Sequence, residues 1–500
     1  MTTNVDETRS VTIIGTGFGG IGMAVRLKQA GFEDITILEK AGDVGGVWRD
    51  NSYPGAACDV PSHLYSFSFA PKHDWSRRFA PQAEILDYLR ETAERFDVLR
   101  HVRLNTEVEG ASFDETAGQW IVRLADGSTH TSDVLVTAVG QLSRPAFPRI
   151  PGIDSFKGEI FHSATWNHDF DLTGKEVAVI GTGASAIQFV PHVQKQVKSL
   201  TLFQKDPAHV LPKSDYAYAE AASVAFAKVP GLQALSRWAT YWQLEPRSVA
   251  FTRFPRLMGI VERQFAKYLR HQVKDPVKRA LLTPTDPIGC KRILLSNDYY
   301  PALDQDNVSI VNDAIVEVRP SGVVTQDGTV HRVDAVVLGT GFQATDFLAP
   351  MHISGRGGLD LNDAWRDGAE AHLGISVAGF PNLFLLYGPN TNLSHSSIVF
   401  MLESQIAYIL QSVRKLADER VTWIEVRPEV QDEFNVRIQE RIGASVWDKG
   451  CNSWYQTAAG KNTNNWPGST LTYRLRTRRP DWNHFIFQPA HEPAQPQQAH

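Results

Sequence analysis

Two short segments combine closely spaced glycines with a later charged residue, a pattern that suits nucleotide phosphates. The first reads Gly15-Thr16-Gly17-Phe18-Gly19-Gly20. Glycine is needed where the chain turns, where the backbone approaches a pyrophosphate, and where a helix packs on a strand. The free N–H groups at the start of that helix favour an anion. Glu39 follows roughly 20 residues later, where an acid accepts ribose hydroxyls. The pattern predicts an adenine-dinucleotide site formed by Gly15, Gly17, Phe18, Gly19, Gly20, Glu39 and Lys40.

The second segment reads Gly181-Thr182-Gly183-Ala184-Ser185-Ala186, with a small residue in place of the third glycine. The strand after it ends in Lys205 and not in an acid. A lysine there would neutralise a ribose 2′-phosphate, which Glu39 would repel. The second site is therefore expected to bind NADP through Gly181, Thr182, Gly183, Ser185, Ala186 and Lys205. The alternative for Lys205 is a solvated lysine at a strand end.

The elements around these turns repeat. Val11–Gly15, Ile21–Ala30 and Ile35–Leu38 read as strand, helix and strand, and the same order recurs at Glu176–Ile180, Ile187–Gln196 and Leu200–Phe203. Two such units roughly 165 residues apart indicate two nucleotide-binding domains and not a short repeat. The expected fold class is α/β, with two Rossmann-like dinucleotide-binding domains and a helical insertion.

We predict the domain boundaries from composition. Residues 1–145 form the first part of one domain, and residues 146–333 form the second domain, with an aromatic-rich helical insert at 207–285. Residues 334–488 return to the first domain, entering through the strand Ala335–Leu338 and ending in a lid loop. The Pro/Gln-rich residues 489–500 are expected to be a disordered tail.

Further features near the first site suit a flavin. Gly46-Val47-Trp48 allows the backbone to pass close to a bulky ligand. The strand that leads to Asn390 is followed by residues 391–397 at the start of an expected helix, whose N–H groups could face an anionic flavin ring.

Composition excludes several classes. A net charge of −5 indicates no polycationic surface for nucleic acid or an anionic membrane. No apolar run reaches the ~20 residues that span a bilayer, and the N-terminus has no apolar signal segment, so a cytoplasmic location is expected. Cys58, Cys290 and Cys451 are far apart, which indicates neither a disulfide nor the dithiol centre of a disulfide reductase. No metal-ligand spacing is present, and the oligomeric state cannot be inferred.

One string resembles a family fingerprint. FKGEIFHSATW, from Phe156 to Trp166, matches FxGxxxHxxxW, with Gly158 and His162 at the inner positions. This string is typical of the type I Baeyer–Villiger monooxygenases, a group of class B flavoprotein monooxygenases. The order of motifs agrees from Val11 to about Tyr473. Ser163, Asn167 and Lys205 depart from the usual residues and leave the substrate open. From the residues alone, His162 is interpreted as a hydrogen-bonded bridge between domains.

The resemblance implies FAD at the first site, NADPH at the second, and conversion of a ketone to an ester or lactone with O₂ through a C4a-peroxyflavin. It makes Arg292 the cation that stabilises the peroxyanion, with Asp59 orienting it, and assigns Lys291, Arg292 and Trp454 to the binding of NADP. The remaining residues that it assigns to FAD are Gly46, Val47, Trp48, Asp59, Tyr65 and Asn390. The alternative is a flavin monooxygenase that oxygenates sulfides or amines.

Overall fold

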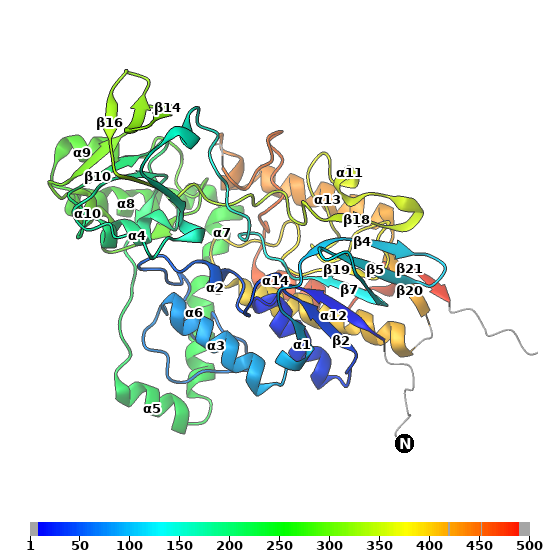
Figure 1. Ribbon diagram of the computed structural model, residues 1–500. Helices are drawn as coiled ribbons and strands as arrows, with labels where there is room; N and C mark the ends of the chain where they lie inside the picture. The colour runs from blue at the N-terminus through cyan, green and yellow to red at the C-terminus, as the bar shows by residue number, and fades with distance from the viewer. Residues whose placement is uncertain (1–8, 419–420, 452, 490–500) are drawn as a thin grey trace, which may run out of the picture.

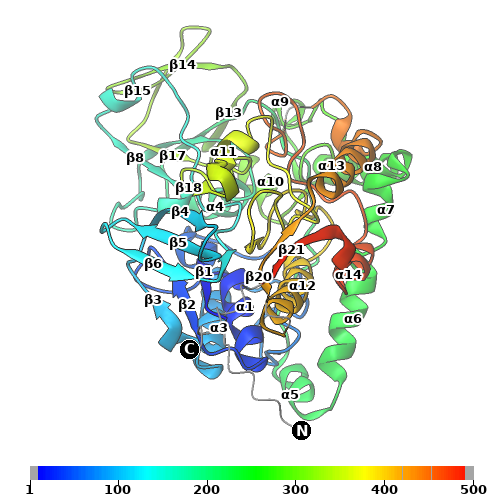
Figure 2. The ribbon, with the colours of Figure 1, turned by 90° about the vertical axis from the view of Figure 1, so that its right-hand side faces the viewer.

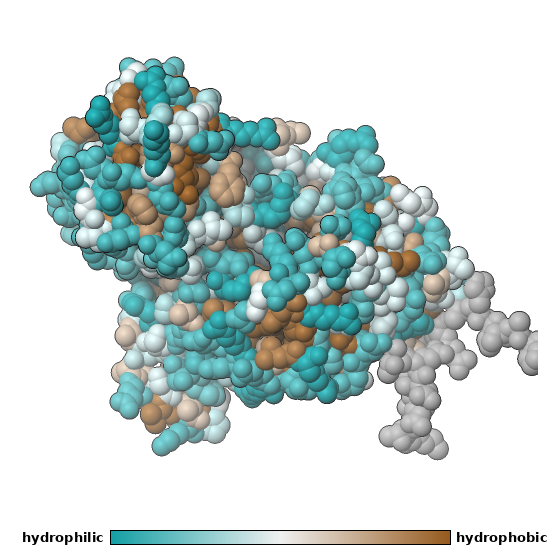
Figure 3. Space-filling model, viewed as in Figure 1, coloured by the Kyte–Doolittle hydropathy of each residue, from teal (hydrophilic) through white to brown (hydrophobic). Residues whose placement is uncertain are grey.

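The computed structural model describes residues 9–418, 421–451 and 453–489. The described chain forms two lobes, each built on a five-stranded parallel sheet (Figure 1). The expected α/β class with two Rossmann-like units is confirmed. The surface is hollowed where the two lobes meet (Figure 3).

The sheet of the first lobe has the strand order β19-β7-β1-β2-β3. Its strands are Val11–Ile14 (β1), Ile35–Leu38 (β2), Val102–Arg103 (β3), Val134–Thr137 (β7) and Leu383–Leu385 (β19). The central strand β1 is buried at every residue, and its mainly β-branched apolar sequence, with one threonine, is typical of a parallel strand covered on both faces. One face of the sheet packs against helices and the other against a second sheet, β18-β4-β5-β6. That second sheet consists of Val108–Asp114 (β4), Gln119–Leu124 (β5), Thr129–Ser132 (β6) and His352–Ser354 (β18).

The helices of the first lobe come from both ends of the chain. They are Phe18–Gln29 (α1), Val47–Asp50 (α2), Gln82–Arg95 (α3), Leu361–Ala364 (α11), Ile398–Asp418 (α12), Pro428–Gly443 (α13) and Thr470–Thr477 (α14). Long α12 packs along α1, and the antiparallel pair of Val421–Val426 (β20) and Phe485–Pro489 (β21) closes the lobe. Pro489 is therefore the last strand residue and not part of a tail, whereas residues 490–500 of the predicted tail lie outside the described residues.

The sheet of the second lobe has the order β13-β10-β9-β17-β8. Its strands are Glu159–His162 (β8), Glu176–Ile180 (β9), Ser199–Phe203 (β10), Val308–Val311 (β13) and Ala335–Leu338 (β17). Helices Ala186–Val193 (α4) and Tyr299–Leu303 (α10) cover one face. The antiparallel strands Ile315–Arg319 (β14), Gly322–Thr325 (β15) and Val330–Arg332 (β16) pack on the other face.

The strand β17 corrects one prediction. It was expected to return the chain to the first domain, but it pairs with β9 and β8 in the second sheet. The second lobe therefore extends past residue 333, and β19, beside β7, rejoins the first sheet. A four-residue apolar strand before a glycine turn fits either parallel sheet, so its pattern alone could not decide between them.

Two linkers cross between the lobes side by side. One leaves β7 and the other leaves β17, and Pro145 bridges to Phe342 in antiparallel fashion. The Ala146 N–H donates to the Gly341 carbonyl at 2.8 Å, and the Gln343 N–H donates to the Arg144 carbonyl at 2.9 Å. The lobes are thus joined by a two-strand connection and not by a single flexible chain.

Residues 207–285 contain five α-helices, which as a group contact both lobes. They are Glu220–Lys228 (α5), Leu232–Leu244 (α6), Arg247–Thr252 (α7), Met258–Gln272 (α8) and Pro276–Leu281 (α9). The short strand Val210–Leu211 (β11) precedes them and pairs with Leu294–Leu295 (β12). Phe265 and Leu269 of α8 lie in the core of the second lobe. Tyr241 of α6 instead stacks on Phe400 of α12, at 5.0 Å between ring centroids. Figure 2 shows α5, α6, α7 and α8 along one edge of the molecule.

Within the described residues, no helix combines the length and the apolar character needed to cross a membrane.

Candidate active site

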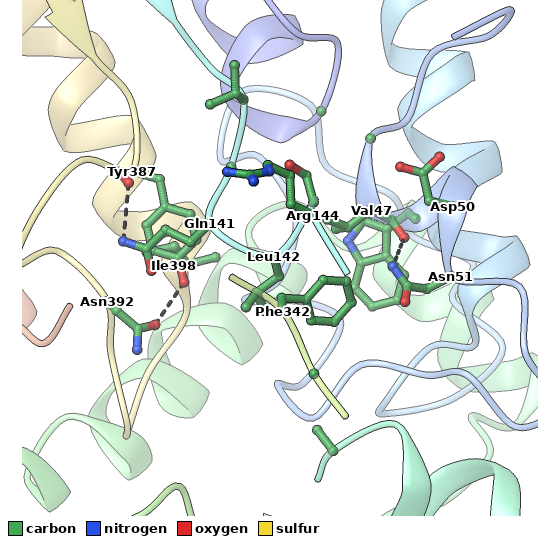
Figure 4. A pocket seen from close by; sticks show the side chains of 18 of the residues that line it. Val47, Asp50, Asn51, Gln141, Leu142, Arg144, Phe342, Tyr387, Asn392 and Ile398 are labelled. Atoms are coloured by element: carbon green, nitrogen blue, oxygen red, sulfur yellow. Dashed lines mark hydrogen bonds between the residues drawn. The ribbon is translucent and has the colours of Figure 1, made fainter. Parts of the chain in front are cut away.

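A cavity of about 1330 Å³ lies between the lobes, and both glycine turns and both linkers line it. This volume exceeds the roughly 300–1,000 Å³ of common small-ligand pockets and suits two dinucleotides. In Figure 4, Gln141 and Leu142 of the first linker lie beside Phe342 of the second. The Gln141 amide donates to the Tyr387 carbonyl at 3.4 Å, and the Tyr387 hydroxyl donates to Asn392 Oδ1 at 2.8 Å.

The first glycine turn brings bare backbone to the cavity. Gly15 has a φ of +101°, and a Cβ there would lie 2.7 Å from the Ala138 carbonyl oxygen. A Cβ on Gly20 would lie 1.9 Å from the Gly15 carbonyl oxygen, so Gly20 lets α1 start directly on the turn. Gly15, Gly17, Phe18 and Gly19 line the cavity, whereas Gly20 acts only through this packing.

Glu39 lies at the end of β2, is 5% exposed and lines the cavity. Its Oε2 accepts hydrogen bonds from the Thr16 backbone N–H at 3.1 Å and from the Thr16 hydroxyl at 2.6 Å. Its Oε1 accepts from the Ala41 N–H at 3.0 Å and lies 3.2 Å from Arg49 Nη1. The carboxylate therefore connects the glycine turn to the segment that follows β2. The next residue, Lys40, is exposed and also lines the cavity.

Three aromatic side chains predicted for the flavin site pack together. The Trp48 indole N–H donates to the Tyr65 hydroxyl at 3.2 Å, and the Tyr65 ring meets Phe18 edge-on at 5.1 Å. All three line the cavity with Gly46 and Val47. They form a rigid apolar wall.

Asn390 does not face the cavity. It has a φ of +55° and is 3% exposed. Its amide donates to the carbonyls of Asn462 and Asn465, at 3.0 and 3.2 Å. Asn390 therefore anchors the C-terminal segment beneath the cavity wall.

The second glycine turn carries an unpaired cation. Gly181, Thr182, Gly183 and Ser185 line the cavity, while buried Ala186 instead packs against Gly339. Lys205 also lines the cavity, is exposed, and forms no ion pair with any described residue. An exposed, uncompensated lysine beside a glycine turn suits an added phosphate.

Lys291 is held in place by two carboxylates. Its Nζ lies 3.0 Å from Asp206 and 2.6 Å from Asp286. Burial opposes the charge on Lys291, but hydrogen bonds to Asp286 and Asp206 outweigh it and raise the pKa above its ordinary value. The sequence did not predict a role for Asp206 or Asp286, because aspartates in turns are common on protein surfaces.

Arg292 and Asp59 meet at the cavity wall, although they are 233 residues apart. Arg292 Nη2 donates to Asp59 Oδ2 at 2.6 Å, and Nη1 donates to the Leu393 carbonyl at 3.2 Å. Burial alone would raise the pKa of Asp59, but the charge of Arg292 lowers it below its ordinary value. Asp59 in turn raises the pKa of Arg292. Both groups remain charged, and their side chains are 27–28% exposed.

The C-terminal lid segment reaches the same place. Trp454 lines the cavity and is 37% exposed, and its ring lies 4.4 Å from that of buried Tyr455. Cys451 of this segment forms a disulfide with Cys290, which corrects the expectation of unpaired cysteines. A separation of 161 residues hides such a pair from sequence spacing, because only the fold brings the Cα atoms to 6.3 Å.

The fingerprint residues lie beside the cavity and do not line it. His162 is fully buried, its Nδ1 accepts from the Ala164 N–H at 3.1 Å, and burial lowers its pKa. Its ring contacts Phe147 and Phe342 of the two linkers, at 5.4 and 5.9 Å. His162 thus bridges the two linkers by ring packing, and a hydrogen bond with the Gly341 backbone of the second linker adds to this bridge.

The other fingerprint residues support the second lobe. A Cβ on Gly158 would lie 2.2 Å from the Asp334 carbonyl oxygen. Trp166 packs on Phe189 of α4 at 5.4 Å, and Phe156 lies against the core under β14 and β15. These residues shape the lobe and the linkers rather than the cavity wall.

Sequence patterns did not indicate several linker residues that line the cavity. They are Gln141, Leu142, Arg144, Thr340 and Phe342, together with Tyr387, Leu393 and Ser396 further along the chain. The glycines at 140 and 341 mark both crossings and could have indicated them.

Two glycine turns with opposite charges, facing one cavity, define an oxidoreductase of the double-dinucleotide type. Residues 8–351 match the family of FMO-like, flavin-binding monooxygenases, and the chain belongs to that family. It is 46% identical to a Baeyer–Villiger monooxygenase of Pseudomonas aeruginosa over 94% of this chain and 90% of the relative. It is also 46% identical to one of Streptomyces coelicolor over 98% of this chain and 95% of the relative.

Solved structures agree with this assignment. A steroid monooxygenase bound to NADP matches with a TM-score of 0.85 and 31% identity, over 96% of this chain and 99% of that chain. OTEMO in complex with FAD and NADP matches with a TM-score of 0.86 and 28% identity, over 96% and 99%. The resemblance stated from the fingerprint is confirmed, and FAD and NADP are the cofactors that the two turns fit.

Proposed function

We propose that the protein is a Baeyer–Villiger monooxygenase that uses FAD, NADPH and O₂ to convert a ketone into an ester or lactone. The observation that carries the proposal is the Arg292–Asp59 pair, which faces the cavity between the two glycine turns. The names of the 46%-identical relatives support the same reaction.

Arg292 supplies a permanent positive charge. Oxygen insertion beside a carbonyl passes through oxyanions, and a fixed cation at low solvent exposure stabilises them without reorganising. Asp59 and the Leu393 carbonyl fix two of the guanidinium nitrogens and leave the remaining donors for the reacting atoms. Asp59 is thus the positioning partner, and Arg292 is the group that meets the developing charge.

The bound flavin supplies the activation of O₂, and the chain supplies position, charge and exclusion of water. The first turn and Glu39 would hold the adenosine part of FAD, and the Trp48–Tyr65–Phe18 wall would support it. Lys205 would bind the 2′-phosphate of NADPH, and Lys291, fixed by Asp206 and Asp286, would bind the same cofactor closer to Arg292. Trp454 would cover the nicotinamide and limit solvent access.

The substrate is a small ketone, and NADPH supplies the reducing equivalents. We place the enzyme in the cytoplasm, where NADPH is available.

The test is NADPH consumption by the FAD-loaded protein with cyclic, linear and aryl ketones, scored by mass spectrometry for products heavier by one oxygen. Arg292→Ala should lower ester formation by about 100- to 1,000-fold, the usual cost of removing an oxyanion-stabilising group. FAD should stay bound, which visible absorbance would verify.

A different outcome would redirect the assignment. Sulfoxides or N-oxides without any ester would indicate a monooxygenase for soft nucleophiles, which has no need of Arg292. If hydrogen peroxide were the only product, the ketones tested would be excluded as substrates, and the assignment as a flavoprotein would still hold.

A further inference from the structure

The outer face of α6 is apolar. Leu235, Trp238 and Trp242 follow at helical spacing and are 65%, 50% and 55% exposed. The opposite face carries Tyr241 and Leu244, which are buried in the core of the first lobe. On a surface helix that contacts only water, the side chains that face the solvent are normally polar. The apolar outer face of α6 is therefore suited to contact with apolar surroundings.

Helix α14 extends the apolar face. Leu471 and Leu475, one turn apart, are 39% and 61% exposed. The Thr470 hydroxyl donates to the Tyr241 hydroxyl at 3.1 Å, and the Leu471 N–H donates to Glu245 at 3.1 Å. These bonds place the start of α14 against the C-terminal half of α6, and Figure 2 shows the two helices together. We call these five exposed side chains the apolar patch.

Basic residues are frequent in the helical segment that carries α6 and at the end of α14. Residues 220–281 contain eleven lysine and arginine residues against four acidic ones, in a chain whose net charge is −5. The end of α14 adds four more arginines within six residues. Of these fifteen basic residues, fourteen form no ion pair with any described residue, and the other, Arg237, lies 3.6 Å from Glu403. The acidic residues instead lie mostly on the rest of the molecule, so the net charge of the whole chain conceals this distribution.

The positive charge is also ordered. On α8, Arg263, Lys267 and Arg270 lie at i, i+4 and i+7 and are all exposed, which gives one basic stripe along the helix. Ile260, 56% exposed, precedes them on the same side. Figure 2 shows α6, α7 and α8 stacked along one edge of the molecule, with α14 beside α6.

We propose that the flank formed by α6, α7, α8 and α14 binds reversibly to an anionic lipid surface. Tryptophan and leucine side chains insert at the level of the headgroups, while arginine and lysine contact lipid phosphates. A second copy of this chain is the less suitable occupant, because a symmetric contact would bring two uncompensated basic surfaces together. The proposal concerns binding alone and does not depend on the oxygenation chemistry.

The test uses the FAD-loaded full chain in a vesicle flotation assay. Vesicles of phosphatidylcholine alone are compared with vesicles containing one quarter phosphatidylglycerol. We expect binding to the anionic vesicles that weakens by at least about tenfold in 0.5 M NaCl, because exposed charges are screened. Binding to neutral vesicles should be weaker by a similar factor.

Two double variants separate the contributions. Trp238→Ser/Trp242→Ser removes the apolar anchor, and Arg478→Glu/Arg479→Glu reverses two exposed charges outside the cavity. Each should weaken binding to anionic vesicles by about tenfold or more. The matched control is Val316→Ser/Val330→Ser, two exposed apolar residues on β14 and β16, which should change nothing. Retained flavin absorbance and NADPH consumption would show that the variants are folded, whatever the substrate of the enzyme is.

Three results would overturn the proposal. They are an absence of binding to anionic vesicles by the unmodified protein, equal binding to neutral vesicles, and unchanged binding by both double variants. A dimer in sedimentation that the tryptophan variant abolishes, without any vesicle binding, would assign the apolar patch to a second copy.

Discussion

The two glycine turns have the same backbone plan but differ in what surrounds them. At the first turn, Glu39 is buried and already bonded to Thr16, Ala41 and Arg49. At the second turn, Lys205 is exposed and forms no ion pair within the described part of the chain. The first site is therefore preorganised around its ligand, whereas the second presents an uncompensated charge to solvent. This difference suits a flavin that stays bound and a nicotinamide cofactor that binds and leaves.

The two regions also differ in how they are fixed. Packing and hydrogen bonds within one lobe hold the first site. At the second, the segment that carries Lys291 and Arg292 is tied to the C-terminal lid through Cys290 and Cys451. The segment that carries Arg292, the proposed cation, is therefore restrained by a covalent link that has no counterpart at the first site among the described residues.

The largest expected effect comes from that link. Cys451→Ser should lower the free energy of unfolding by about 4–5 kcal/mol, because a disulfide that closes a loop of this length restricts the unfolded chain. Urea denaturation without reductant measures the change, with Cys58→Ala as the control. Thiol titration of the unfolded, unreduced protein should find one thiol, and a count of three would contradict the pairing.

The charge at the second turn comes next. Lys205→Glu should raise the KM for NADPH by about 100-fold, since it replaces attraction to the 2′-phosphate by repulsion, and it should leave NADH unaffected. Steady-state kinetics with both cofactors test this, with Lys195→Glu as the control of equal charge change on the same lobe. An equal loss with NADH would remove Lys205 from phosphate recognition.

The charge at the first turn should have a smaller effect. Glu39→Gln should weaken FAD binding by about tenfold, because it removes a charged acceptor but keeps the shape of the side chain. Dialysis followed by flavin fluorescence measures the affinity, and Glu33→Gln on the surface of the same lobe is the control. Unaltered affinity would limit Glu39 to the support of the turn.

The smallest effect concerns pH and compares the lobes directly. Burial lowers the pKa of His372 in the first lobe and of His209 in the second to about 4. Between about pH 6.5 and pH 4 the unfolded chain binds protons that the folded chain does not, so stability falls as the pH falls. His372→Gln and His209→Gln should each reduce, by less than one, the number of protons taken up on unfolding. The free energy of unfolding should therefore decline less steeply with falling pH. Urea denaturation from pH 7 to pH 4.5 would measure this change. If the free energy of unfolding of both variants declined as steeply as that of the unmodified protein, the lowered pKa values of the two histidines would be contradicted.

Much of the site was predictable wherever function depends on local backbone. Glu39, Lys205, the aromatic pair Trp48–Tyr65 and the glycine turns, apart from Gly20 and Ala186, line the cavity. Asn390, which the resemblance assigned to FAD, and the fingerprint residues occupy supporting positions and do not line the cavity. A motif shows that a residue is required and does not show which way its side chain points.

By itself, the sequence determined two nucleotide-binding units, the opposite charges at their ribose ends and the family, because each of these depends on residues close together in the chain. Only the tertiary structure decided that β17 belongs to the second sheet, that Cys290 meets Cys451, that Asp59 meets Arg292, and that basic and apolar side chains gather on one flank. These features join segments up to 233 residues apart. Such contacts depend on how the lobes and the helical segment pack together, and a local sequence pattern does not predict that packing.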